Sequence, residues 1–312
     1  MQKLSEGRKM WVSVMVIFII WAVVFIIFED YDRKNNIPLG EPSDWHLLLF
    51  SLLVMAGLGW LLYRYARNMD QRISREQQQR QDQLRRELTQ NIGHELKTPV
   101  ASILGFTDTL LANPDISDAV RRQFIERTNA QARRLTALLQ DLSLLNKMDH
   151  ASELLVRERV DVSVMVADIT LETSQALTAR SMTFRNCLPN DVCIQGNWHT
   201  LYSIFRNLTD NAISYAGEAT TIELSVRETP TAWHFTFADN GIGVAPEHLP
   251  RIFERFYRVD KGRSRQLGGT GLGLSIVKNA VALHGGTIAA TANPGGGLRF
   301  DFMLCKQAKS QA

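Results

Sequence analysis

The chain has 312 residues, with 35 basic and 32 acidic side chains and a formal charge of +3. This near balance gives no reason to expect direct binding to nucleic acid, which usually requires a strongly basic domain. Hydrophobic residues make up 45% of the chain and charged residues 21%, which excludes a disordered protein. Three cysteines exclude a disulfide scaffold. The length allows two domains, or three small ones.

Two long apolar runs lie near the amino terminus. Residues 10–28 and residues 46–63 contain no Asp, Glu, Lys or Arg. About 20 apolar residues span the hydrocarbon core of a bilayer, and aromatic residues near the ends of both runs are typical of a membrane interface. We therefore expect two transmembrane helices. A signal peptide is the alternative for the first run, and no small-residue cleavage site follows it.

Basic residues predict the orientation of these two helices. Three lie in the tail 1–9, two in the loop 29–45, and four follow the second run between Arg64 and Arg75. The excess of Lys and Arg on the cytoplasmic side of a membrane then places both termini in the cytoplasm. The external loop is too short to bury a core of its own. Its acidic side chains suit a solvated connector, with a cation site as the alternative.

The next region is predicted to be helical. Residues 64–84 are polar, free of Gly and Pro, and form a linker helix. In 85–151, apolar residues recur every three or four positions in two stretches, separated by Asn113-Pro114-Asp115, with Ser117 or Asp118 as a helix cap. One hairpin cannot bury its apolar face alone, so we expect an all-α homodimeric four-helix bundle.

A histidine with distinctive neighbours lies on the first of these helices. His94 is followed by Glu95, with Thr98 one turn on and Pro99, which removes a helical hydrogen bond to the Glu95 carbonyl. A neutral imidazole can attack a phosphoryl group through one nitrogen while a nearby carboxylate accepts the proton of the other. Adjacent helix residues do not face each other squarely, so Glu95 must reach around to do this.

The segment His94–Pro99 resembles the phosphoacceptor motif of the sensor histidine kinases of two-component systems. The resemblance implies that His94 is the phosphoacceptor and Glu95 its acid/base partner. It also implies that Thr98 positions water for dephosphorylation of a partner regulator.

Residues 152–306 show a mixed α/β pattern, followed by a tail at 307–312. Strands are expected at 157–162, 182–187, 192–195, 220–228, 232–238, 287–292 and 298–304, and helices at 163–179, 198–215 and 270–283. A sheet with helices on one face is the expected layer arrangement.

Four segments of this region resemble motifs of the same kinase family, in the same order. They are residues 207–215, 239–244, 251–258 and 268–275. Together they resemble a Bergerat-type ATP-binding domain, an α/β sandwich, and the resemblance covers about residues 85–306. It implies ATP and Mg²⁺ as cofactors.

The resemblance also implies roles for single residues. Asn207 and Asn211 lie four apart, on one helix face, and their amide oxygens would bind Mg²⁺ together with the phosphates. Asp239 would accept a hydrogen bond from the adenine amino group. The other implied nucleotide contacts are Tyr215, Gly241, Gly243, Gly269, Thr270, Gly271, Leu272 and Gly273. Glycines just before a helix offer N–H groups and a positive helix end to phosphate.

One position departs from the family pattern. Ser214 stands where the family often has Lys or Arg, and Arg258 or Lys261 is a candidate to replace that phosphate contact. The polar, glycine-flanked residues 261–269 are predicted to form a lid over ATP. Asn207 is a Glu in related hydrolysing ATPases, and an amide cannot act as that base, which favours transfer to histidine over hydrolysis.

Packing is the expected role of the other conspicuous residues. These are Phe253 and Phe256, the cysteines 187, 193 and 305, and the histidines 150, 199, 234, 248 and 284. All three cysteines are expected to be buried.

The sequence therefore predicts a homodimeric sensor histidine kinase, a multi-pass protein of the bacterial cytoplasmic membrane. ATP would phosphorylate His94, and the phosphoryl group would pass to an Asp on the receiver domain of a separate response regulator. A degenerate kinase acting as a membrane scaffold or phosphatase is one alternative, but it would lack ATP-binding residues. An ATPase that performs conformational work is another, but it would carry a carboxylate at position 207 and no phosphoacceptor motif.

Overall fold

The computed structural model describes residues 42–150, 156–260 and 269–306, together with positions 19, 21, 23, 26, 30 and 34. The side chains of residues 42–50, and of several positions between 70 and 87, are not described. The chain divides into two compact units, Met1–Arg86 and Glu87–Ala312. The predicted tails 1–9 and 307–312, and most of the first predicted span and the loop after it, lie outside the described residues.

The first unit contains the start of the long helix α2, Pro42–Ala112. The helix predicted to follow the second apolar run is therefore confirmed as part of a longer one. The described residues hold no helix with a stretch that is both long and apolar enough to cross a membrane. The predicted second span begins at residue 46, within the part of α2 whose side chains are not described.

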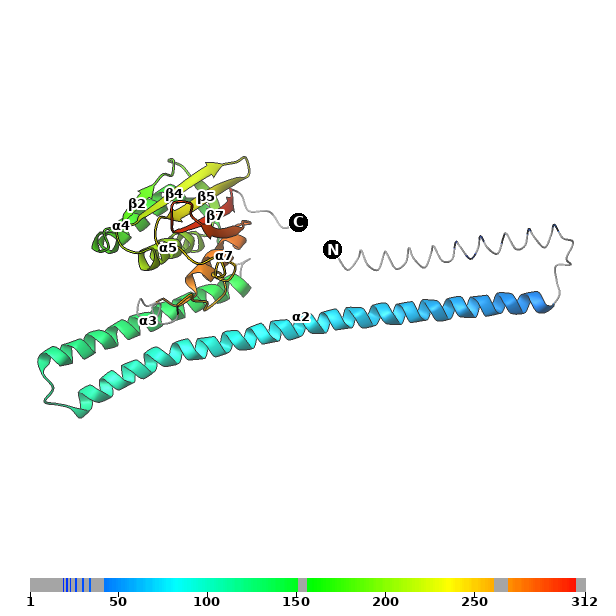
Figure 1. Cartoon of the computed structure of the whole chain (residues 1–312), viewed down its shortest axis with the longest axis horizontal. Coiled ribbons are helices and arrows are strands. Elements are labelled where there is room, and N and C mark those ends of the chain that lie inside the picture. Colours follow the sequence, from blue (N-terminus) through cyan, green and yellow to red (C-terminus); the bar gives the residue numbers. More distant parts are fainter. Residues whose placement is uncertain are drawn as a thin grey trace. The chain divides into compact units, whose positions relative to one another are not determined.

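The second unit begins with a helical hairpin formed by the end of α2 and by α3, Asp118–His150 (Figure 1). The predicted turn is confirmed, and the N–H of Arg121 donates to the carbonyl of Ser117 at 2.9 Å, so α3 starts just after Ser117. Phe106 and Phe124 stack across the turn, with ring centroids 5.6 Å apart. The predicted apolar row of α3 ends in the buried residues Leu138, Leu145 and Met148.

The rest of the second unit is the predicted α/β domain. Its elements are β1 Glu158–Asp161, α4 Val162–Ala179, β2 Thr183–Asn186, β3 Cys193–Gly196, α5 Trp198–Tyr215, β4 Thr221–Glu228, β5 Ala232–Asp239, α7 Gly273–Leu283, β6 Ile288–Ala292 and β7 Leu298–Cys305. One sheet has the order β2-β4-β5-β7-β6, with only the β2–β4 pair parallel. β1 and β3 form a separate antiparallel pair. Every predicted strand and helix is confirmed, although the helix predicted from Thr270 begins at Gly273.

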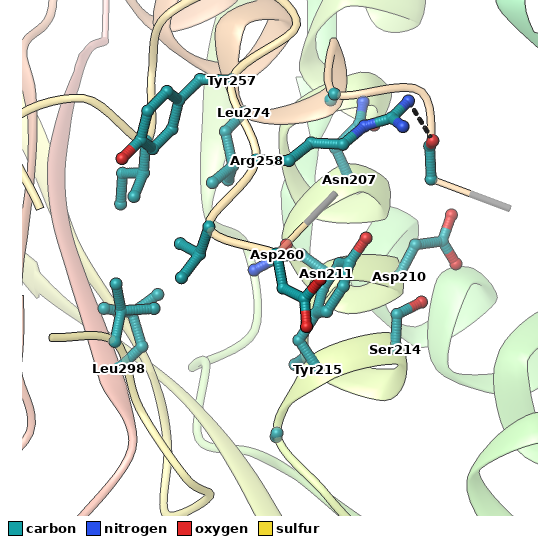
Figure 2. A pocket seen from close by; sticks show the side chains of 18 of the residues that line it. Asn207, Asp210, Asn211, Ser214, Tyr215, Tyr257, Arg258, Asp260, Leu274 and Leu298 are labelled. Carbon is teal, nitrogen blue, oxygen red and sulfur yellow. Dashed lines mark hydrogen bonds between the residues drawn. The ribbon is translucent and has the colours of Figure 1, made fainter. Parts of the chain in front are cut away.

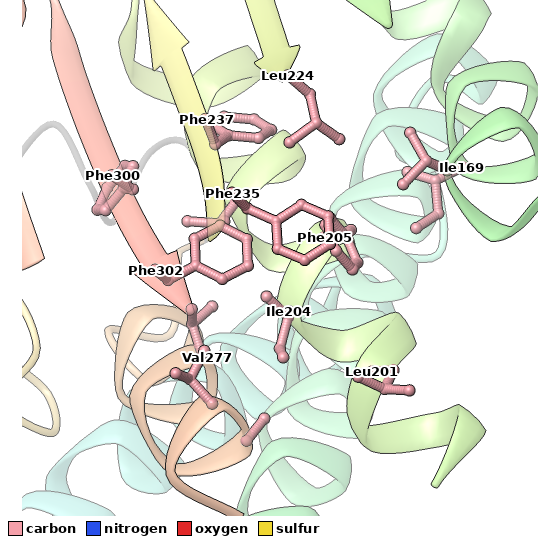
Figure 3. Packing of buried hydrophobic residues seen from close by; sticks show 14 of the residues in the cluster. Ile169, Leu201, Ile204, Phe205, Leu224, Phe235, Phe237, Val277, Phe300 and Phe302 are labelled. Carbon is pink, nitrogen blue, oxygen red and sulfur yellow. The ribbon is translucent and has the colours of Figure 1, made fainter. Parts of the chain in front are cut away.

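Alternation along the strands decides which face of the sheet is buried. The buried positions of β7 are Leu298, Phe300, Phe302 and Leu304, and the residues between them are partly exposed. In β5, Phe235 lies opposite Phe302 with the rings stacked at 5.1 Å, and Phe205 of α5 approaches both at 5.4 and 5.9 Å (Figure 3). The expected sheet with helices against one face is confirmed.

The expectation that all three cysteines are buried is wrong. Cys187 is exposed, and Cys193 and Cys305 are partly exposed. Cys187 follows the edge strand β2, and Cys305 points away from the buried face of β7. Phe253 and Phe256 pack against the core as expected.

His284 is a buried histidine at the end of α7. Its Nδ1 lies 2.8 Å from the carbonyl oxygen of Ala280, so Nδ1 must carry the proton of the ring. A Cβ atom at Gly196 would lie 2.4 Å from Nε2, so the ring packs directly against the backbone of β3. Burial lowers the pKa of His284, the hydrogen bond to the Ala280 carbonyl opposes this, and the nearby cation Arg157 lowers the pKa by a smaller amount.

This lowered pKa predicts a pH dependence of stability. The folded state binds a proton at His284 less readily than the unfolded chain, whose histidine pKa is about 6.5. The contribution is therefore fully present above that pH and is lost as the pH falls below it. We expect thermal unfolding of His284→Gln to depend less on pH between about 8 and 5.5 than that of the wild type. His199→Gln, which replaces an exposed histidine, is the control variant. An unchanged slope in His284→Gln would contradict the prediction.

Candidate nucleotide-binding site

A cavity of about 430 Å³ opens between α5, the end of β5, the segment that follows β5 and the start of α7 (Figure 2). Residues from all four predicted motif segments line it. The predicted contacts in its wall are Asn207, Asn211, Tyr215, Asp239, Gly243, Arg258, Gly269, Thr270, Gly271 and Gly273. Gly241 and Leu272 are not among the lining residues, and Lys261 lies outside the described residues.

Helix α5 presents one face to the core and another to the cavity. The core face consists of Leu201, Ile204, Phe205, Leu208 and Ala212. The cavity face carries Asn207 and Asn211, four residues apart as predicted (Figure 2). The amide Nδ2 of Asn207 donates to the carbonyl of Ser203 at 2.7 Å. This bond turns the acceptor Oδ1 toward the start of α7, where a Cβ atom at Gly273 would lie only 2.7 Å away.

Asp239 is the last residue of β5 and continues its buried row. It is only 5% exposed, and its Oδ1 accepts hydrogen bonds from the N–H of Gly241 at 2.9 Å and of Leu298 at 3.3 Å. Burial raises the pKa of this carboxyl, and the two N–H groups oppose the rise. Both bonds use the same oxygen, so Oδ2 remains to accept from a donor in the cavity. The exocyclic amino group of adenine is such a donor.

A glycine turn forms the opposite wall of the cavity. Gly271 has φ +73°, so helix α7 cannot begin before it, and this explains the later start of the helix. The N–H of Phe256, which itself has φ +62°, donates to the carbonyl of Gly271 at 2.8 Å. The Thr270 hydroxyl accepts from the N–H of Leu272 at 3.2 Å. The first N–H groups of α7 have no helical partner and lie beside the cavity, which suits binding of phosphate.

Arg258 lies between this glycine turn and the helical hairpin. Its side chain is 5% exposed, and Nη2 donates to the carbonyl of Gly269 at 2.6 Å and to Oε2 of Glu95 at 2.9 Å. Its Nε is buried and has no hydrogen-bond partner among the residues that the structure describes. A guanidinium group is therefore present at the glycine end of the cavity. Ser214, which also lines the cavity, carries no charge there.

The three predicted catalytic residues lie on α2. His94 is exposed, and Thr98 donates through its hydroxyl to the His94 carbonyl at 3.2 Å. The Glu95 side chain is 17% exposed and is engaged by two guanidinium groups, Arg258 and, at 3.4 Å, Arg134. No local sequence pattern predicts these pairs, because Arg258 is 163 positions and Arg134 is 39 positions from Glu95.

The cavity also contains residues that the motifs did not single out, among them Tyr257, Asp210 and Asp260. The Tyr257 hydroxyl lies 2.7 Å from Nδ1 of His248, and the guanidinium of Arg251 lies 4.3 Å from the centre of its ring. These contacts fix the ring in the wall. In the sequence, Tyr257, Asp210 and Asp260 are marked only by lying next to, or close to, residues predicted to contact the nucleotide.

Two protein-family models match the chain. The His Kinase A (phospho-acceptor) domain matches residues 84–151, and the histidine kinase-, DNA gyrase B- and HSP90-like ATPase matches residues 196–308. Sensor-like histidine kinase SenX3 of Mycobacterium tuberculosis is 36% identical over 225 residues, which cover 72% of this chain and 55% of that protein. Phosphate regulon sensor protein PhoR of Pseudomonas aeruginosa is 34% identical over 219 residues, covering 70% and 49%. The chain thus spans about half the length of these curated relatives.

Solved structures share the fold of the second unit. Histidine kinase AdeS of Acinetobacter baumannii superposes with a TM-score of 0.56 at 22% identity, over 68% of this chain and 98% of that one. ThkA, solved in complex with the response regulator protein TrrA, gives 0.57 at 19% identity, over 72% and 63%. ShkA, solved with AMPPNP, gives 0.51 at 25% identity, over 72% and 45%.

The glycine turn yields a prediction for nucleotide binding. In Gly271→Ala, the new Cβ would lie 3.0 Å from the Cα of Phe256, and the residue would have to keep φ +73°. Strain of this kind costs about 1–3 kcal/mol, so we expect affinity for a fluorescent ATP analogue to fall by roughly 5- to 150-fold. Gly295→Ala is the control, since its Cβ would meet nothing within 4 Å. Equal affinities in the two variants would show that the turn does not shape the site.

Proposed function

The chain belongs to the sensor histidine kinases, and on that premise we propose that ATP bound in this cavity phosphorylates His94. An imidazole nitrogen of His94 attacks the γ-phosphorus, the bond from phosphorus to the ADP oxygen breaks, and the ring loses the proton of its other nitrogen to a base. The observation that carries the proposal is the convergence of all four motif segments on one cavity.

The residues present fit a nucleotide with Mg²⁺. Asp239 offers a buried acceptor for adenine, and the turn at Gly271 with the start of α7 offers N–H groups for phosphate. The amide oxygens of Asn207 and Asn211 are the hard oxygen ligands that Mg²⁺ prefers. When bound, Mg²⁺ neutralises charge on the phosphates. Neither amide can deprotonate water, so the site protects ATP from hydrolysis until the histidine attacks.

Glu95 is the proposed base for His94. Arg134 and Arg258 both donate to the same oxygen of its carboxylate, Oε2, so Oε1 can accept the imidazole proton. If Arg258 exchanged Glu95 for the phosphate, it would replace the cation lacking at Ser214. Thr98, one turn from His94, would position water when the regulator is dephosphorylated.

Transfer of the phosphoryl group to an Asp of a response regulator completes the proposed function, and the working form would be a homodimer. Apolar side chains exposed on the hairpin support dimerisation, because a second hairpin would cover them in a four-helix bundle. They include Val100, Leu104, Leu111, Ile125 and Leu139.

Radiolabelling tests the proposed reaction. With ATP labelled on its γ-phosphate, the full chain in membranes should acquire label that is lost in acid and stable in alkali, and His94→Gln should acquire none. His199→Gln, a substitution of an exposed histidine on α5, should label like the wild type. Label that persists in His94→Gln would sink the assignment. Nucleotide binding without any label, together with dephosphorylation of a regulator, would favour the scaffold or phosphatase alternative.

We propose in addition that the amino-terminal region anchors the chain in the bacterial cytoplasmic membrane, with both termini in the cytoplasm. The two uncharged runs at 10–28 and 46–63 support this. In α2, exposed apolar side chains occupy consecutive positions and hence all sides of the helix, which suits lipid better than water; they include Leu52, Leu53, Val54, Leu58, Leu61 and Leu62. The indole N–H of Trp21 donates to the Ser51 hydroxyl at 3.3 Å, which links the two runs.

Extraction with alkaline carbonate tests the anchor. The wild type should stay in the membrane pellet. A variant with Ile19→Asp and Val23→Asp in the first run and Val54→Asp and Leu58→Asp in the second should be released, because an Asp near the middle of a spanning helix costs about 2.5–3.5 kcal/mol. Gln78→Asp, beyond the predicted span, should stay in the pellet. Release of the wild type would refute the anchor without touching the kinase assignment.

A further inference from the structure

Three carboxylates of the helical hairpin bind the ATPase domain. Glu95 pairs with Arg258, as described above. Asp141 of α3 accepts a hydrogen bond from the Thr270 hydroxyl at 2.9 Å. Asp149 of α3 is the third. We call Glu95, Asp141 and Asp149 together the carboxylate clasp.

Asp149 forms the outermost contact of the clasp. Its two oxygens accept from Nη2 of Arg255 at 2.9 and 2.8 Å, and the Nδ2 of Asn279 on α7 donates to Oδ1 at 3.3 Å. Leu145 and Met148 lie beside it in the buried cluster that also contains α7 residues such as Val277. The contact is therefore an apolar patch with an ion pair at its edge.

The clasp uses two groups that belong to the nucleotide cavity. Arg258 and Thr270 both line the cavity, and both are bound by hairpin carboxylates. A guanidinium and a hydroxyl beside a glycine turn are the donors that a phosphate would use. In this arrangement the hairpin supplies the anions in place of a phosphate.

Like charges oppose binding of a phosphate beside the hairpin carboxylates. Burial raises the pKa of Asp141, its bond from Thr270 opposes the rise, and Asp210 in the cavity wall raises it as a like charge. Asp141 thus lies close enough to Asp210 for the two carboxylates to disfavour each other's charge. A triphosphate would bring several more negative charges against the same carboxylates.

We propose that Asp141 and Asp149 dock the ATPase domain on α3 in a resting arrangement that competes with ATP for Arg258 and Thr270. Docking weakens nucleotide binding, and nucleotide weakens docking by the same factor. A signal that shifts α3 against the ATPase domain would then change ATP affinity and release Glu95 for His94 in one movement. This inference rests on the proposed function for ATP binding in the cavity, for the phosphate contact of Arg258 and for the role of Glu95.

The test measures binding of AMPPNP with Mg²⁺ to the full chain, which requires no phosphoryl transfer. Asp149→Ala removes the outer ion pair, and Asp141→Asn removes a charge while keeping an acceptor for Thr270. We expect each variant to bind AMPPNP more tightly by several-fold, and the double variant by about tenfold, within the range of measured coupling between sites. Asp118→Asn, at an exposed ion pair with Arg121 on the same helix, is the matched control and should bind like the wild type.

A charge reversal separates docking from a general effect on folding. Asp149→Arg alone should bind AMPPNP more tightly, and adding Arg255→Asp should return the affinity to the wild-type value by re-forming the pair with opposite signs. Unchanged or weaker AMPPNP binding in Asp149→Ala and Asp141→Asn, or no return in the reversed pair, would overturn the proposal. Failure of His94 to acquire label would sink the kinase reaction alone, since AMPPNP affinity is read independently.

Discussion

The ATPase domain depends on one constraint, the period-two alternation of β4, β5 and β7. Their registers place large apolar residues opposite one another, as in the pairs Phe235–Phe302 and Phe237–Phe300. One face of the sheet is therefore apolar. Each such side chain contributes roughly 1.5–3 kcal/mol when it is buried, so α5 and α7 are held on that face. The same alternation decides where the chemistry lies, because Asp239 is the next inward-pointing position after Phe237.

A carboxylate at the end of an apolar row is tolerated only because its surroundings satisfy it. Two N–H groups donate to Oδ1 of Asp239. One belongs to Gly241, just after β5, and the other to Leu298, the first residue of β7. These bonds partly offset the cost of removing Oδ1 from water. The cost at Oδ2 is offset only when a ligand donates to it. Helix α5 obeys a similar division, with its core face and its asparagine face set apart by the helical period. The nucleotide cavity lies where the inward-facing row of β5 and the core face of α5 give way to polar residues.

Local patterns predicted the elements well and the contacts between distant segments poorly. The helix Trp198–Tyr215 was predicted with both ends correct, because its apolar period is strong and Asn197 caps it. The start of α7 was placed too early, because the positive φ of Gly271 is set by its bond with Phe256 rather than by propensity. The motifs located the cavity wall, but no period or spacing links Glu95 to Arg258 or Asp149 to Arg255. The cysteines were misjudged because an average tendency to burial does not show that Cys187 follows an edge strand or that Cys305 points away from the buried face of β7.

The two ion pairs between the hairpin and the ATPase domain, Asp149–Arg255 and Glu95–Arg258, differ in burial and therefore in how easily they separate. The Asp149 and Arg255 side chains are about one-third exposed, at 33% and 30%, and pairs open to water typically contribute only about 0–1 kcal/mol. Glu95 and Arg258 are far more buried, and Glu95 also pairs with Arg134. Separating Glu95 from Arg258 would therefore leave the buried guanidinium of Arg258 without its ion-pair partner, at a cost of several kcal/mol. We therefore expect this pair to open only when Arg258 has another anion to bind. In the proposed function, the phosphate of ATP is that anion, and the imidazole N–H of His94 is a new donor for Glu95. The buried pair would then couple release of Glu95 to the arrival of ATP.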